Sequence, residues 1–157
     1  MDTPSRITKV AWFAGLFEGE GTFNFANGKP KAMSIQMTDE DVLNRVQKNF
    51  GGSVHLLKKR QDHWKDCWKW SITGQKSVDL AKEIKPFLLS RRQARCEEYI
   101  KLYKSREAFR QNREDFRTKV KHLRSQGLTH AAIAGIMKCD RSYVSHILAG
   151  TYDSVVQ

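Results

Sequence analysis

Cysteines are few in this sequence, and their spacing gives them no common role. Cys67, Cys96 and Cys139 lie far apart, are odd in number and include no pair with metal-ligand spacing. A disulfide framework and a zinc site are therefore not expected, and a reducing, intracellular setting fits. Long apolar runs are missing too, so the sequence predicts neither a membrane span nor the apolar segment of a secretory signal peptide.

Acidic residues are scarce relative to basic ones. The 157 residues include 17 Asp and Glu against 28 Lys and Arg, and the resulting net charge of +11 favours a polyanionic partner. The segment 91–124 holds 12 basic and 5 acidic residues and contributes +7 of this charge, whereas the charges from Ser125 onward sum to zero. This segment is predicted to be a long basic helix that links two modules, although many of its charges would simply be solvated. Phe109 and Phe116 are too sparse for a helix that lies on a membrane surface, so no membrane partner is expected.

Between residues 8 and 85 the apolar residues alternate between the helical period and the strand period. Asn27-Gly28 is typical of a hairpin turn, Thr38 is expected to cap a helix, and Gly51-Gly52 is expected to end it. The expected elements are a helix at 8–20, strands at 22–25 and 32–37, a helix at 39–50, strands around 54–56 and 68–72, and a helix at 75–85. The order αββαββα predicts an α+β fold in which helices cover only one face of an antiparallel sheet.

The other face of this sheet would be open and polar. A twisted antiparallel sheet can lie in the major groove of DNA, and amides, hydroxyls and cations suit base edges. An ordinary solvated sheet face is the alternative. The tryptophans are expected in the core or in the groove wall, with Trp64 in a polar segment that could touch DNA. The candidate DNA-binding residues of this face are Asn24, Ser34, Gln36, His55, Lys59, Lys69 and Ser71.

The first predicted helix combines small residues with carboxylates at its end. Small side chains at positions 14, 15 and 19 would let a second backbone approach closely, and Gly21 would stop the helix. Glu18 and Glu20 would be delivered to that end, where acids oppose the helix dipole unless a partner or a metal offsets them. A divalent metal site and a helix end with solvated acids are both compatible with this pattern.

The segment Phe13–Gly21, Phe-Ala-Gly-Leu-Phe-Glu-Gly-Glu-Gly, resembles the LAGLIDADG motif of homing endonucleases, with Glu for Asp at both acid positions and Phe at the first position. Trp12 and Thr22-Phe23 fit the same pattern, and the resemblance covers about residues 8–104. It implies the αββαββα fold of that family with antiparallel DNA-binding sheets. Because only one motif copy is present, it also implies a homodimer whose motif helices pack across a two-fold axis through Ala14, Gly15 and Gly19.

The same resemblance implies a catalytic centre. Glu20 of each subunit, with Gly19 beside it, would hold Mg²⁺ or another divalent cation such as Mn²⁺, whereas Ca²⁺ would support binding without cleavage. Asp39 matches the polar position of the pocket and would order water. Arg91 matches the basic position, with Arg92 as the alternative. No nucleotide cofactor is implied.

A second motif is predicted in the C-terminal part of the chain. Residues 127–137 and 141–150 would form two short helices joined by a turn, which resembles the helix-turn-helix of resolvases and sigma factors. Thr129 would cap the first helix, and apolar residues would pack the pair together: Ala132, Ile133, Ala134, Val144 and Ile147. The expected base contacts are Arg141, Ser142, Tyr143, Ser145 and His146. A plain helical hairpin is the alternative.

These inferences predict an endonuclease domain at 1–104, a basic helical linker at 105–124 and a helix-turn-helix module at 125–157. The expected function is metal-dependent cleavage of both strands of a long, specific site in double-stranded DNA. The expected setting is a bacterial or phage cytoplasm or an organelle matrix. One alternative is a DNA-binding regulator that does not cut, which an intact Glu20 argues against. The other is an RNA maturase that assists intron splicing. The helix-turn-helix argues against this second alternative, because it favours duplex DNA as the partner.

Overall fold

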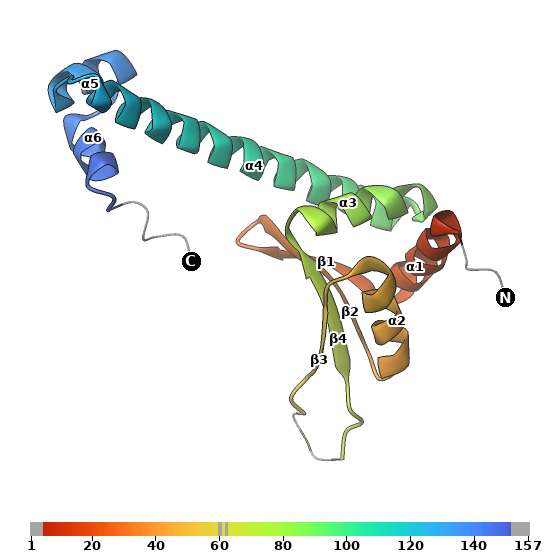
Figure 1. The fold of residues 1–157 in the computed structure, drawn as a ribbon. Coiled ribbons are helices and arrows are strands. Elements are labelled where there is room, and N and C mark those ends of the chain that lie inside the picture. The colour runs from red at the N-terminus through yellow and green to blue at the C-terminus, as the bar shows by residue number, and fades with distance from the viewer. Residues whose placement is uncertain (1–4, 60, 62, 152–157) are drawn as a thin grey trace. The chain divides into compact units, whose positions relative to one another are not determined.

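The computed structural model describes residues 5–59, 61 and 63–151 (Figure 1). These residues form two compact units that divide between Arg106 and Glu107. The first unit contains α1 (Arg6–Glu20), β1 (Gly21–Ala26), β2 (Lys29–Met37), α2 (Glu40–Phe50), β3 (Ser53–Leu56), β4 (Trp68–Thr73), α3 (Gly74–Ile84) and the short 3₁₀ helix η1 (Lys85–Phe87). The helix α4 (Ser90–Ser125) begins in the first unit and ends in the second, which also contains α5 (His130–Met137) and α6 (Arg141–Leu148). The predicted order αββαββα is confirmed.

The sheet is antiparallel throughout, with the strand order β1-β2-β4-β3. Its first hairpin turns at Asn27 and Gly28, whose φ angles of 50° and 69° are the left-handed values that such a tight turn requires. The predicted Asn-Gly turn is therefore confirmed. The long β2 strand pairs with β1 on one side and with β4 on the other, so it lies at the centre of the open face.

Helices cover one face of the sheet and form the core of the first unit with it. Phe13 and Phe17 of α1 are fully buried, and the Phe13 ring lies 5.4 Å from the Trp70 ring of β4 in an edge-on arrangement. The Trp70 indole N–H donates to the Gly51 carbonyl oxygen at 2.8 Å, which satisfies the polar atom of this buried side chain. The remaining sheet residues in this core alternate along their strands, as a half-buried sheet requires: Phe23, Met33, Ile35 and Ile72.

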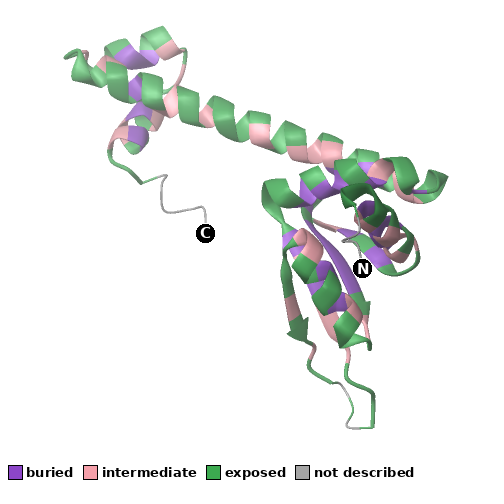
Figure 2. Cartoon of the chain, turned by 45° about the vertical axis from the view of Figure 1, so that its right-hand side comes forward, coloured by how far each residue is buried: buried purple, intermediate pink, exposed green. Residues whose placement is uncertain are grey.

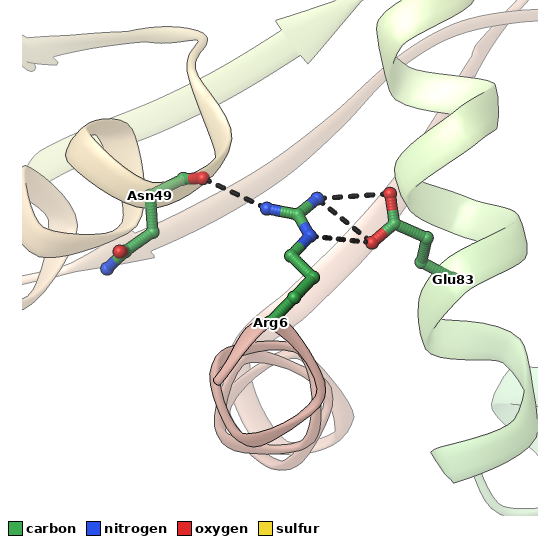
Figure 3. A network of polar contacts seen from close by, with 3 residues as sticks. All are labelled: Arg6, Asn49 and Glu83. Carbon is green, nitrogen blue, oxygen red and sulfur yellow. Dashed lines mark hydrogen bonds and ion pairs between the residues drawn. The ribbon is translucent and has the colours of Figure 1, made fainter. Parts of the chain in front are cut away.

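Arg6 ties the first turn of α1 to two other helices (Figure 3). Its guanidinium forms a two-pronged ion pair with Glu83 of α3, with donor–acceptor distances of 3.0 Å. It also donates to the Asn49 carbonyl oxygen at 3.2 Å, and its Cζ atom lies 5.0 Å from the centre of the Phe50 ring. α1 begins at Arg6 rather than at residue 8, because the Ser5 hydroxyl accepts the Thr8 amide hydrogen and so caps the helix two residues earlier.

Other expected boundaries need small corrections. Asp39 rather than Thr38 occupies the N-cap position of α2, which begins at Glu40. The first helix of the C-terminal pair begins at His130 rather than near Gly127, because the backbone of Gly127 is left-handed with a φ of 87°. Thr129 caps this helix through its hydroxyl, as predicted, by accepting the Ala132 amide hydrogen at 3.3 Å.

The second unit has a small core of its own. It buries Val120 of α4, Ile133 and Ala134 of α5, and Val144 and Ile147 of α6. The predicted packing roles of the α5 and α6 residues are confirmed, with one exception. Ala132 is exposed, since the helix turns it away from α6.

The basic helix α4 is buried only toward its two ends, and Figure 2 shows its middle exposed or partly buried. Cys96 and Tyr99 lie in the core of the first unit, whereas Phe116, Val120 and Leu123 pack in the second. The predicted long helix is confirmed, and the stretch expected as a linker also supplies side chains to the second core. Across the described residues, no helix is both long and apolar enough to span a bilayer.

Candidate active site and nucleic-acid interface

The end of α1 presents one free carboxylate beside the sheet. Glu20 is the last residue of this helix and is exposed, and Gly21 begins β1 directly after it. Gly21 leaves no room for a side chain, because a Cβ atom there would lie 2.3 Å from the Phe17 ring and 2.5 Å from its carbonyl oxygen. The abrupt change from helix to strand therefore requires glycine, and it holds Glu20 at the rim of the open face.

Arg92 of α4 caps this helix end. Its Nε donates to the Glu18 carbonyl oxygen at 3.1 Å, and its Nη2 donates to the Gly19 carbonyl oxygen at 3.4 Å. Its Nη1 also donates to the Gly21 carbonyl oxygen. A cation at a helix C-terminus offsets the negative end of the helix dipole and satisfies carbonyls that lack a partner within the helix.

The two acids of the motif have different environments. The Glu18 carboxylate accepts the Leu89 amide hydrogen at 3.2 Å, so it fixes the segment that leads into α4. Among the described residues, none makes a hydrogen bond or an ion pair with the Glu20 carboxylate. Glu20 is therefore the acid of this helix that remains available to a ligand.

The structure separates the two candidates for the basic residue. Arg91 is exposed in the first turn of α4, whereas Arg92 is partly buried and reaches the end of α1. Asp39 is also exposed, at the start of α2, and makes no side-chain capping bond there. Gly21, the residue after Glu20, pairs with Ile35, so Gln36 lies on β2 one residue beyond the partner of the helix-to-strand junction, and Asp39 lies three residues further along the chain.

The strand registers assemble the predicted open face in two rows. One row crosses the sheet through Gln36, Lys69 and His55. The next row crosses it through Thr22, Ser34, Ser71 and Ser53. The sequence interpretation omitted Thr22 and Ser53, although the alternation of their strands, with Phe23 and Val54 as the neighbouring apolar residues, places both on this face.

Ser34 needs a correction, because it is only 3 % exposed and presents little surface to a ligand. It lies on β2, one of the two inner strands of the sheet. Its hydroxyl accepts a hydrogen bond from the Asn24 side-chain amide at 2.7 Å, so its role is to hold Asn24. Lys59 lies outside the strands, in the segment between β3 and β4, and forms an ion pair with Asp66 at 3.0 Å.

The three small residues of the motif helix do not share one environment. Ala14 is fully buried in the core of its own unit, so it has no surface left for a second chain, and its predicted interface role is wrong. Gly15 and Gly19 are exposed, and a Cβ atom on either would meet nothing within 4 Å. At these two positions the exposed surface of α1 carries no side chain.

The donor atoms suit a hard divalent cation, although one chain supplies few of them. No cluster of three or more His, Cys, Asp or Glu side chains that could hold a metal occurs among the described residues. Mg²⁺, however, is commonly held by one or two carboxylates together with substrate phosphates and water. The exposed Glu20 carboxylate fits that pattern, whereas the Gly19 carbonyl is shared with Arg92.

In the second unit, α6 presents fewer polar side chains than predicted. Arg141, Ser142 and His146 are exposed. Tyr143 instead packs its ring 5.7 Å from the Phe116 ring of α4, and Ser145 is partly buried. These two residues stabilise the unit, so the surface expected to contact bases is narrower than the sequence indicated.

Two polar contacts fix α6 relative to α5. The Ser145 hydroxyl lies 3.0 Å from Nδ1 of His130, which joins the two helices. Asp140 caps α6 by accepting the Ser142 amide hydrogen at 2.7 Å. Hydrogen bonds from the side chain and the backbone of Ser142 lower the pKa of this carboxyl below its usual value. α6 is thus held at its start by a charged cap.

The family model of the LAGLIDADG-like domain matches residues 8–85. The chain contains a LAGLIDADG-like domain. The matched residues include α1 from its third residue onward, the whole sheet, α2 and α3, and therefore Glu20 and the open face. Arg92 and the second unit lie outside the matched residues.

The chain is also similar to three individual proteins. The intron-encoded RNA maturase bI4 of Saccharomyces cerevisiae is 37 % identical over 54 residues, which are 33 % of this chain and 8 % of the maturase. The chain thus spans a small part of that relative. The homing endonuclease I-CvuI in complex with its target in the presence of Ca has a TM-score of 0.50 and 20 % identity, with 63 % of this chain and 68 % of that chain covered. The archaeal intron-encoded homing endonuclease I-Vdi141I complexed with DNA has a TM-score of 0.47 and 15 % identity, with 92 % and 97 % covered.

Proposed function

We propose that the LAGLIDADG-like domain of this chain binds double-stranded DNA through the open face of its sheet and cleaves both strands with a divalent metal. The observation that carries the proposal is the free Glu20 carboxylate, held by Gly21 and Arg92 at the rim of that face. The net charge of +11 supports a polyanionic substrate. Gln36, Lys69 and His55 would meet the DNA nearest to the carboxylate.

In this proposal Glu20 supplies carboxylate oxygens to Mg²⁺, and the DNA supplies phosphate oxygens. When bound, the metal activates water and stabilises the leaving oxygen. Arg92 holds the helix end and so fixes the position of Glu20. Asp39 would order water, and Arg91, exposed on the next helix, would contact phosphate.

A homodimer would bring a second Glu20 to the site. The exposed Gly15 and Gly19 would let two α1 helices pack closely, since neither residue has a side chain to separate them. Gly15→Leu should then abolish dimers, measured by sedimentation with and without DNA, whereas Gly135→Ala on α5 should not. A wild-type chain that sediments as a monomer and binds DNA as one copy would contradict the dimer.

Glu20→Gln tests the catalytic assignment. The variant should lose cleavage but keep DNA binding, because the amide is a poor metal ligand whereas affinity comes mainly from phosphate contacts. Nicking and gel-shift assays on the same DNA site separate the two effects. Asp41→Asn, which removes one exposed carboxylate from α2, is the matched control and should cut normally. Strong Mg²⁺-dependent cleavage by Glu20→Gln would refute the assignment.

The second unit would act as a helix-turn-helix module that extends the contact with DNA. In this proposal the chain divides into an endonuclease domain at 1–104, a helical linker at 105–124 and a module at 125–157. Arg141→Ala and His146→Ala should shorten the protected region in a footprint and leave the cut position unchanged. Full protection by both variants would favour a structural or protein-binding role for α6.

An RNA maturase is the second candidate, and the similarity to the maturase of Saccharomyces cerevisiae is the observation that favours it. A maturase would stabilise a folded intron and would not need the free carboxylate. Splicing of the host intron, measured with wild type and with Glu20→Gln, separates the two functions. A chain that promotes splicing but never cuts DNA would establish the maturase in place of the nuclease.

A further inference from the structure

An open pocket of about 310 Å³ lies at the outer end of the sheet, between β3 and β4. Two arms of chain form it. Lys58 and Lys59 follow β3 on one arm, and Trp64 and Lys65 precede β4 on the other. The arms are joined by a hydrogen bond from the Leu57 amide to the Cys67 carbonyl oxygen at 2.9 Å and by the ion pair between Lys59 and Asp66 at 3.0 Å. These contacts hold the lysines of opposite arms around one cavity.

The three lysines of the pocket are not all neutralised by acidic residues in the described part of the chain. Of its three lysines, Lys59 is paired with Asp66. Lys58 and Lys65 form an ion pair with none of the described acidic residues. The two lysine ammonium groups repel each other across the cavity. An anion bound between them would offset this repulsion, because both ammonium groups attract it. A lysine ammonium binds phosphate as a point charge with rotatable donors.

An apolar surface lies beside these cations. Trp64 is 48 % exposed, and Leu57 is partly buried next to it in the lining. Tryptophan combines a large apolar face with one polar atom and suits contact with a sugar or a base. A cation pair beside an indole face is complementary to a nucleotide unit, in which a phosphate adjoins an apolar ring.

Gln36 connects the pocket to the candidate active site. It lines the pocket, and it follows Ile35, the partner of Gly21 at the junction between α1 and β1. A DNA strand that passes Glu20 along the open face would therefore reach this pocket next. The volume is at the small end for ligand sites, which fits one nucleotide unit rather than a large cofactor.

We propose that the pocket binds one nucleotide unit of the DNA strand that flanks the cleavage centre, with its phosphate between Lys58 and Lys65 and its sugar against Trp64. This inference rests on the proposed DNA binding and extends it. The pocket anchors the strand beside the Glu20 centre. Its contribution is independent of DNA sequence, because phosphate and sugar are the same at every position.

The test is the salt dependence of DNA binding. Lys58→Ala/Lys65→Ala is compared with Lys48→Ala/Lys76→Ala, which removes the same charge from exposed positions on α2 and α3. A duplex of arbitrary sequence is titrated with full-length protein by fluorescence anisotropy, without metal, over a range of salt concentrations. Loss of one phosphate contact should reduce the slope of log affinity against log salt by about 0.9, while the control variant keeps the wild-type slope.

Trp64→Phe provides a second readout. DNA should quench the tryptophan emission of wild type, and Trp64→Phe should lose that quenching while its melting temperature stays within a few degrees of wild type. Equal slopes for the two double variants, or unchanged quenching in Trp64→Phe, would overturn the inference while the proposed nuclease stands. A wild-type chain that binds no duplex at low salt would refute both the proposed function and this inference.

Discussion

Arg92 is the residue whose replacement should do most damage to the candidate active site without touching its carboxylate. Its guanidinium donates to the carbonyl oxygens of Glu18, Gly19 and Gly21, and these are the carbonyls around the end of α1. Arg92→Ala removes all of these bonds and the positive charge at the helix end. The helix would then fray from its last turn, which is the turn that carries Glu20.

The size of the effect follows from these contacts. A hydrogen bond that involves a charged group contributes about 1.5–3 kcal/mol, and a cation near a helix C-terminus contributes about 0.3–1 kcal/mol. The sum overstates the loss, because Arg92 is only partly buried and water replaces some of the bonds. We therefore expect Arg92→Ala to lower the free energy of unfolding by about 1–3 kcal/mol. Arg92→Lys should lose about half as much, since one ammonium cannot reach all three carbonyls.

The chain offers both a matched control and a local probe. Arg91→Ala removes the neighbouring, exposed guanidinium and should change the free energy of unfolding by less than about 0.5 kcal/mol. All four tryptophans lie in the first unit, so denaturant unfolding followed by tryptophan emission reports this unit and not the second. If Arg92→Ala unfolded at the same denaturant concentration as Arg91→Ala, the capping role of Arg92 would be wrong.

Three further predictions concern stability and reactivity. Gly21→Ala should lower the free energy of unfolding by about 1–3 kcal/mol, because its Cβ would clash with Phe17. Gly19→Ala should be neutral or slightly stabilising, because its Cβ would meet no atom within 4 Å, and denaturant titration compares the two variants. Hydrogen bonds at the start of α6 lower the pKa of Asp140, so its stabilising effect is present above about pH 4 and is lost as the pH falls through the lowered pKa. Asp140→Asn should remove this dependence in thermal melts recorded from about pH 2 to about pH 6. Burial raises the pKa of Cys96 to about 11, so its thiol should resist alkylation in the native protein while the two partly exposed cysteines react, as counted by mass spectrometry.

The order of helices and strands was predictable because local patterns specify it. The Asn27-Gly28 turn and the cap at Thr129 each depend on a few neighbouring residues, and each is confirmed. The alternation predicted for β2 is only partly confirmed, because Ala32 and Ser34 are buried as well as Met33 and Ile35. At the start of α2 an error of one residue arose because Thr38 and Asp39 are both polar residues that could cap the helix. The structure decides such cases through backbone angles that the sequence does not display.

The environment of individual site residues was harder to predict. A small residue on the motif helix faces either its own core or a second chain, and only the packing of α1 on the sheet shows that Ala14 faces inward. Similarly, Ser34 lies on the predicted face yet is shielded by its neighbours, and Tyr143 packs on Phe116 instead of facing solvent. These outcomes depend on contacts between residues that are distant in the sequence, about which periodicity carries no information.

The two glutamates of the motif show how this chain accommodates its departure from Asp at both acid positions. The longer side chain lets the Glu18 carboxylate reach the Leu89 amide, so the first acid joins α1 to the start of α4. Arg92, three residues further along, then takes up the carbonyls at the helix end. Arg92 offsets the dipole, and the Leu89 amide, just before α4, binds the first acid. The second acid is therefore left as an exposed carboxylate on a helix end whose carbonyls are bound by Arg92. A metal-binding residue needs that combination of a free ligand atom and a fixed backbone. It follows that α4, which lies outside the residues matched by the LAGLIDADG-like family, contributes to the position of Glu20 through its own side chains.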